Sequence, residues 1–113
     1  MAIQTTTKKN SMATAYGSDT AYGALFTTAG TSSPGTEVTG GSPAYARKAL
    51  TWSAPTAGVI TASATFDVPA CTVLGTGVFS AVTAGTYLDG NAVTSVTFSG
   101  QDTVTVTFTA TVV

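Results

Sequence analysis

The sequence predicts an all-β fold, an antiparallel β-sandwich of the jelly-roll or immunoglobulin-like kind with an extended N-terminal arm. Three observations support this prediction. Threonine and valine, whose branched side chains favour strands, are abundant. Only 8% of the residues are charged, against roughly 25% in an average globular domain, so few Lys and Glu side chains are available to coat exposed helices. Apolar and polar residues also alternate in short segments that are separated by turn-forming residues.

The length of 113 residues fits one domain. Residues 1–20 are small and polar without a strong period, and we expect them to form an arm, with Ser11 able to cap a short helical turn that runs through Ala15. Residues 21–113 then form the sandwich. A polar arm of this kind typically becomes ordered against a neighbouring molecule.

The first half of the sandwich region contains three predicted strands. Residues 21–28 form the first, and a loop rich in Gly, Ser and Pro follows over residues 29–43. Residues 45–52 can form the second strand. The third, residues 59–68, alternates cleanly between apolar and polar side chains. Its apolar face consists of Ile60, Ala62, Ala64, Phe66 and Val68.

The second half continues with residues 72–81, an evenly apolar strand that we expect to be covered on both faces. Residues 84–88 form a short strand that ends at a hairpin turn over residues 89–91, and residues 92–98 form the next strand. Residues 103–112 alternate most strictly, with threonine at every odd position. This threonine face is either a solvated surface or a contact surface for a neighbouring subunit. In total we expect about seven strands, as in sandwiches and barrels.

The residue types argue for a structural or binding module and against an enzyme. The chain has no histidine, which is the commonest general base and metal ligand. Its carboxylates are scattered, and turn formation accounts for Asp89 and Asp102; a loop calcium site is the open alternative. The five carboxylates are Asp19, Glu37, Asp67, Asp89 and Asp102. We expect no cofactor and no metal.

Two further motifs receive structural interpretations. Cys71 is the only cysteine, so it forms no disulfide within the chain, and its apolar neighbours predict a small buried hydrophobe. The segment Gly75-Thr76-Gly77 lacks the lysine and the following helix of a phosphate loop. It indicates a bend or a close backbone approach inside a strand.

The charge balance limits the partners. The formal net charge is −1, and the four basic residues form two adjacent pairs, so we expect no nucleic-acid binding. No apolar run approaches the roughly 20 residues of a membrane helix, and we expect no membrane partner. So little charge is typical of a protein packed in an assembly, unless a Thr/Ser surface hydrates well enough by itself.

The candidate interface residues are the basic pairs and one tyrosine. Arg47 and Lys48, beside Tyr45, can anchor a partner because Arg and Tyr are favoured at interface centres; a solvated strand edge is the alternative. Lys8 and Lys9 are the corresponding candidates in the arm. Trp52 is interpreted as a core residue, since one aromatic residue rarely makes a ligand platform.

Four stretches resemble a known family, the small virion proteins of tailed phages of actinobacteria, often labelled tail fibre or minor tail proteins. They cover residues 36–49 (Thr-Glu-Val-Thr-Gly-Gly-Ser-Pro-Ala-Tyr-Ala-Arg-Lys-Ala), 52–55, 64–70 and 85–88. The first is the most specific, and the resemblance spans roughly residues 22–108. Residues 100–104 and the arm depart from the family pattern.

The resemblance implies a structural particle protein without catalytic residues. A fibre subunit is usually longer and repetitive, and this chain has no internal repeat. We therefore predict a capsid decoration or minor capsid protein, located on the outer surface of the virion capsid. Its partners would be the major capsid protein and copies of itself at a symmetry axis. The alternatives are a minor tail or tail-fibre-associated protein and a host-glycan-binding sandwich module.

Overall fold

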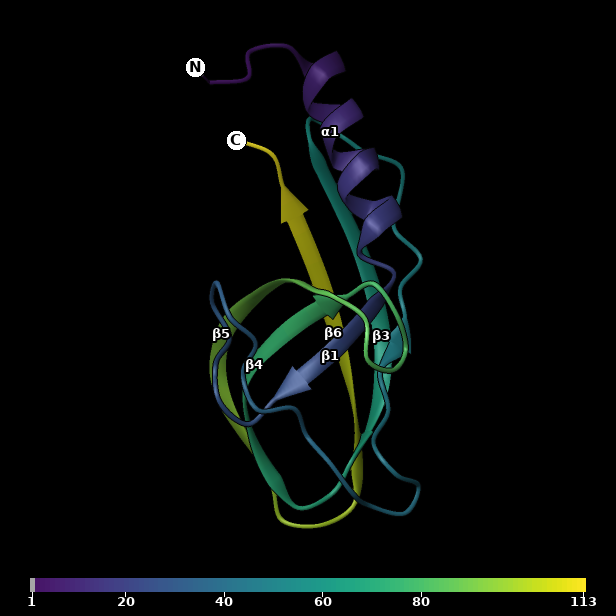
Figure 1. Cartoon of the computed structure of the whole chain (residues 1–113), viewed down its shortest axis with the longest axis vertical. Coiled ribbons are helices and arrows are strands. Elements are labelled where there is room, and N and C mark those ends of the chain that lie inside the picture. The colour runs from purple at the N-terminus through teal and green to yellow at the C-terminus, as the bar shows by residue number, and fades with distance from the viewer. Residues whose placement is uncertain (1) are drawn as a thin grey trace.

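The computed structural model describes residues 2–113, of which most of the ordered elements are strands (Figure 1). The chain is 46% strand and 12% helix, which confirms the all-β class. In chain order the elements are α1 (Thr6–Asp19), β1 (Tyr22–Phe26), β2 (Lys48–Ala49), β3 (Val59–Val68), β4 (Cys71–Phe79), β5 (Tyr87–Phe98) and β6 (Asp102–Thr111).

The strands form two antiparallel sheets that pack together as a sandwich. The larger sheet has the order β2-β1-β4-β5, and the smaller one is a ribbon of β3 and β6. In the ribbon, the register runs without interruption from Val59 opposite Thr111 to Val68 opposite Asp102. With six described strands, this sandwich is smaller than the roughly eight-stranded jelly roll and the roughly seven-stranded immunoglobulin domain.

The main core lies between the two sheets. Leu25 and Val78 on the larger sheet pack with Phe66 and Phe108 on the ribbon, and all four side chains are buried. A second, smaller cluster of Ala24, Phe26, Phe79 and Tyr87 covers the opposite face of the larger sheet. The larger sheet is therefore buried on both faces around β1 and β4, as expected for the evenly apolar sequence of β4.

Residues 1–20 were expected to form an extended arm, but residues 6–19 are helical. Residues 6–19 form α1, whose first turn is capped by Thr5, with the Thr5 hydroxyl accepting from the backbone N–H of Lys8 at 3.3 Å. The helix lies along β3 at the end of the ribbon that extends beyond the larger sheet (Figure 1). Ala13 is 1% exposed at this contact. The helix is therefore packed against the sandwich.

Two strand predictions also need correction. Only Lys48 and Ala49 of the expected strand 45–52 pair as a strand, because residues 36–38 bond to the rest of β1 and its end. The expected hairpin turn over residues 89–91 lies inside β5, which runs unbroken from Tyr87 to Phe98. Gly90 pairs with Gly77 of β4, so turn-forming residues here continue the ladder. The predicted strands 59–68, 72–81 and 103–112 are confirmed as β3, β4 and β6, within a few residues at each end.

The molecule is elongated, with principal extents of 46 × 23 × 22 Å. Its long axis follows the ribbon, which carries α1 and both chain ends at one end of the molecule (Figure 1). The larger sheet covers the ribbon only over the other end. Strand β6 pairs with β3 along one edge, its other edge pairs with no described strand, and the site described next lies along that edge.

Candidate functional site

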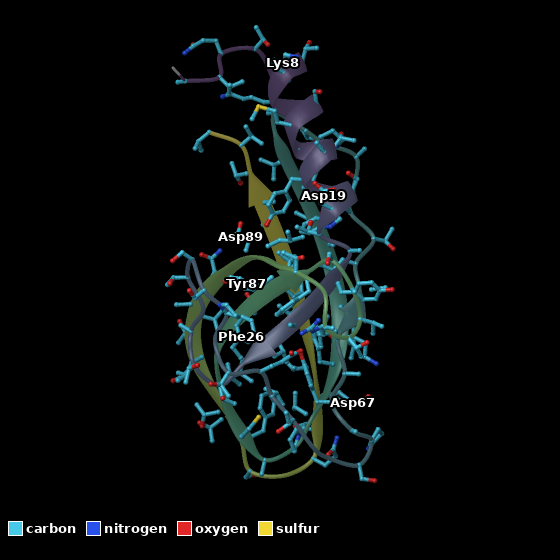
Figure 2. All side chains as sticks on the ribbon, viewed as in Figure 1. Lys8, Asp19, Phe26, Asp67, Tyr87 and Asp89 are labelled. Carbon is cyan, nitrogen blue, oxygen red and sulfur yellow. The ribbon has the colours of Figure 1, made fainter. Side chains whose placement is uncertain are left out.

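The basic residues predicted as contacts lie far apart. Lys8 is exposed in the first turn of α1, at the end of the molecule where both termini lie (Figure 2). Lys9 is half-buried beside Gly58. Lys48 lies toward the other end, with its Nζ 4.0 Å from the carboxylate of Asp67 and its side chain 40% exposed. The structure therefore does not gather these lysines into one patch.

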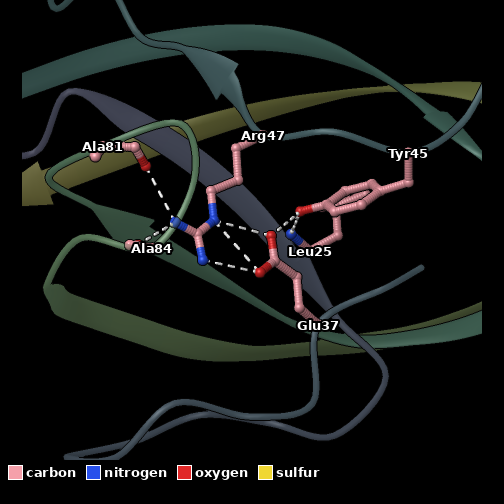
Figure 3. Close-up of polar contacts among 6 residues, drawn as sticks. All are labelled: Leu25, Glu37, Tyr45, Arg47, Ala81 and Ala84. Carbon is pink, nitrogen blue, oxygen red and sulfur yellow. Dashed lines mark hydrogen bonds and ion pairs between the residues drawn. The ribbon is translucent and has the colours of Figure 1, made fainter.

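Arg47 is occupied inside the chain (Figure 3). Its Nε and Nη2 each donate to the Glu37 carboxylate at 3.0 Å, and its Nη1 donates to the carbonyls of Ala81 and Ala84 at 3.0 and 2.7 Å. The guanidinium lies over the Phe79 ring, 3.5 Å from the ring centre. With its side chain 11% exposed, Arg47 ties the loop before β2 to the loop after β4.

Tyr45 belongs to the same cluster. Its hydroxyl donates to Glu37 at 2.8 Å and accepts the backbone N–H of Leu25 at 3.0 Å (Figure 3). Burial raises the pKa of Tyr45 above its ordinary value; the Leu25 N–H lowers it, and the Glu37 carboxylate raises it further. Glu37 is thus the centre of the cluster. Sequence reasoning did not select it, although Glu37, Tyr45 and Arg47 all lie in the stretch that carries the family resemblance.

Trp52 packs against the main core, as predicted, and helps to hold α1 in place. Its indole N–H donates to the carbonyl of Thr20 at 2.9 Å, and its ring meets Tyr16 edge-on with ring centres 6.0 Å apart. The Tyr16 hydroxyl donates to the carboxylate of Asp89 on β5 at 3.0 Å. Burial and this carboxylate raise the pKa of Tyr16. No local sequence signal joins Tyr16 and Asp89, because they are 73 residues apart.

A groove of about 560 Å³ opens beside this contact. One wall is residues 107–112, the final part of β6 and the residue after it, and the other is the facing part of β4 and β5; Tyr16 and Trp52 also line the groove. The first wall contains the apolar residues Phe108, Ala110 and Val112 and the threonines at positions 107, 109 and 111. The groove is therefore an opening in the sandwich where β6 and β5 face each other without pairing.

Strand β5 contains an exposed segment, Asn91–Thr97, that includes two large apolar side chains. Every residue from Asn91 to Thr97 is exposed, so both faces of this segment lack cover. Val93 and Val96 are 37% and 45% exposed, and Leu88 on the same strand is 40% exposed. A register shift opposite Leu74 of β4 lies within this segment, between the pairs Gly75–Ala92 and Val73–Val96. This segment contains no charged side chain.

Cys71 and residues 75–77, which also received structural interpretations from the sequence, all lie in β4. Cys71 is a half-buried free thiol at the start of β4 that packs against the main core, and burial raises its pKa. Gly77 allows the close approach predicted for residues 75–77, because a Cβ there would lie 2.5 Å from the Phe26 ring.

Over residues 2–113, His, Cys, Asp and Glu side chains form no cluster of three or more able to hold a metal ion. Within this same range, no helix has the length and apolar character needed to cross a membrane.

Comparison of the chain with models of known protein families, with curated proteins and with solved structures found no match in any of the three. The resemblance to phage virion proteins therefore remains a prediction. The groove and the exposed strand β5 are the features on which a functional proposal can be based.

Proposed function

We propose that the protein is a structural subunit of a phage particle that binds the outer surface of the capsid as a decoration or minor capsid protein. The observation that carries the proposal is the segment Asn91–Thr97 of β5. It is exposed on both faces, contains two exposed valines and has no charge. Exposed uncharged edge strands promote association, and free monomeric proteins usually protect them with charge, proline or a covering element.

The mechanism is mechanical. A rigid, elongated sandwich that spans a seam between capsid subunits buries additional surface there, and the buried apolar area opposes separation of the subunits. The capsid contacts would be β5 together with the accessible cations Lys8 and Lys48. Lys9 lies next to Lys8 near the start of α1 and is partly buried. Arg47 and Tyr45 support the surface from within, because their polar atoms are occupied by Glu37, Leu25 and the loop carbonyls.

The location is tested by quantitative mass spectrometry on purified virions that have been separated into heads and tails. The proposal expects hundreds of copies in the head fraction, in a fixed ratio to the major capsid protein. A few copies that travel with tails would support the minor tail or tail-fibre alternative and refute the capsid proposal.

The contact surface is tested by adding purified protein to heads that lack it. We expect Val96→Lys to weaken binding by at least tenfold, because it places a charge on the exposed β5 segment. Val82→Lys is the matched control, since Val82 is 46% exposed against 45% for Val96 but lies in the loop after β4. Equal binding by both variants would exclude β5 from the interface. Binding to host-cell glycans instead of heads would support the glycan-binding alternative.

A further inference from the structure

Strand β6 has a regular set of backbone groups that point away from its partner β3. The N–H of Val112 donates to the carbonyl of Gly58 at 2.9 Å. In an antiparallel ladder, residues that bond across to the partner alternate with residues whose N–H and C=O point outward. Counting back from Val112, the even-numbered residues of β6 bond to β3. Thr107, Thr109 and Thr111 therefore direct their backbone groups to the other side, into the groove.

The opposite edge of the ribbon confirms this alternation. Thr61 of β3 lies opposite Thr109, so it should also direct its backbone groups outward. Its carbonyl accepts the N–H of Ser53 at 2.8 Å, and its N–H donates to the Ser53 hydroxyl at 3.0 Å. Ser53 thus caps the β3 edge. Along residues 2–113, no backbone group plays the same part for Thr109.

The free edge of β6 also lacks the features that normally prevent pairing. From Thr103 to Val113 it contains no proline, glycine or charged residue, and its one charge, Asp102, is at the start of the strand. Natural edge strands of this length usually carry lysine, proline or a bulge. A two-stranded ribbon is also marginally stable by itself, and further strands stabilise it.

We propose that β6 pairs with β6 of a second copy of this chain, antiparallel and about a two-fold axis at Thr109. In this arrangement Thr109 faces Thr109 of the second copy, and Thr107 faces its Thr111. All of these are residues with outward-pointing backbone groups, so each facing pair exchanges both N–H···O bonds. The two ribbons become one four-stranded sheet with the order β3-β6-β6-β3.

The side chains agree with this pairing. Because side chains alternate along a strand, Phe108 lies next to Ala110 of the second copy on the apolar side, and the threonines form a continuous hydroxyl face. Thr105 and Thr107 already form hydroxyl contacts of 2.9 and 3.0 Å with Thr65 and Ser63 on this face. The two Asp102 carboxylates lie at opposite ends of the new sheet, so no like charges meet. The added strand fills the groove between β6 and β5.

This inference rests on the proposed function in one respect, that the chain acts as an assembled subunit, and it names the self-contact. The two are tested separately. Self-pairing is measured on the purified full chain in solution, whereas capsid binding needs heads. A chain that dimerises but does not bind heads would refute only the capsid proposal.

The first experiment is sedimentation equilibrium of the full chain over a range of concentrations. We expect a reversible dimer for the wild type and a folded monomer for Thr109→Pro, because this proline removes an N–H that the monomer does not use. Ala110→Pro is the matched control, since it removes an N–H donated to β3 and should unfold the ribbon. A monomeric wild type at every concentration, or a Thr109→Pro variant that dimerises equally, would overturn the proposal.

Cysteine crosslinking keeps the test decisive if Thr109→Pro does not fold. In a Cys71→Ser background, Thr109→Cys should form a disulfide-linked dimer on oxidation, because directly opposed residues in such a pair have Cα atoms about 5.5 Å apart. Thr61→Cys, on the same face but on the capped edge, should remain monomeric. Equal crosslinking of both, or of neither, would overturn the proposal. The proposal would also be overturned if the Thr109 amide resisted hydrogen exchange only when heads are added. That result would mean that the unpaired edge of β6 binds a head protein and not a second copy of this chain.

Discussion

Arg47 and Glu37 form a two-pronged ion pair that joins the loop before β2 to the loop after β4. The Glu37 carboxylate accepts hydrogen bonds from both Nε and Nη2 of Arg47, while Nη1 of the same guanidinium donates to two carbonyls of the loop after β4. Tyr45 supplies a further donor to Glu37. The most specific stretch of the sequence therefore encodes a structural tie under the surface.

Replacement of Arg47 by Met should lower the free energy of unfolding by about 3 kcal/mol, because it leaves the Glu37 carboxylate with one donor in a partly buried position. Arg47→Lys should recover little of this loss, since an ammonium cannot match the planar fork of donors. Urea denaturation measures both. Lys48→Met is the neighbouring control, and its exposed pair with Asp67 should contribute less than about 1 kcal/mol. Similar losses at residues 47 and 48 would contradict the assigned role of Arg47.

Gly77→Ala should destabilise the larger sheet by about 1–3 kcal/mol, because the new methyl group overlaps the Phe26 ring in the smaller core. Gly100→Ala is the control, since a Cβ at Gly100 meets no atom within 4 Å. Thermal unfolding followed by circular dichroism compares the two variants. A Gly77→Ala protein as stable as Gly100→Ala would mean that β1 and β4 adjust without cost.

Docking of α1 can be followed through Trp52, the only tryptophan. Ala13→Asp should separate the helix from β3, because it buries a charge at a position that is 1% exposed. We expect the Trp52 emission to shift to longer wavelength as the indole becomes hydrated. Ala15→Asp makes the same substitution at an exposed position of the same helix and should leave the emission unchanged. Unshifted emission in Ala13→Asp would show that α1 does not protect Trp52.

Stability should fall at alkaline pH through Tyr16 and Tyr45. Both have a folded-state pKa above the ordinary value of 10.0, chiefly because burial disfavours the charged tyrosinate. The folded state therefore holds these protons more tightly than the unfolded state. Their contribution is complete below pH 10 and is lost as the pH rises above it. Urea denaturation from neutral to alkaline pH should show this decline, with a shallower slope for Tyr16→Phe and for Tyr45→Phe. Parallel slopes in wild type and variants would contradict the assignment.

Local sequence patterns were sufficient to predict the strands whose two faces differ. In β3 and β6, each apolar side chain alternates with a polar one, so one face must be buried, and the strand limits follow from that pattern. The composition likewise determined the all-β class, and the close backbone approach at residues 75–77 followed from two glycines in an apolar run. These properties depend on residues that are adjacent or two apart, and local reasoning can reach them.

The helix, the continuous strand β5 and the candidate site depend on long-range contacts. The apolar residues of α1 do not repeat at helical spacing. The helix is held where Gly17 lies beside Ile60 and Trp52, and where Tyr16 meets Trp52 and Asp89. Asp89-Gly90-Asn91 would form a turn in isolation, but pairing with β4 keeps it extended. The groove depends on which edge of β6 lacks a neighbour. Such features arise from contacts between residues far apart in the chain, which no local pattern specifies.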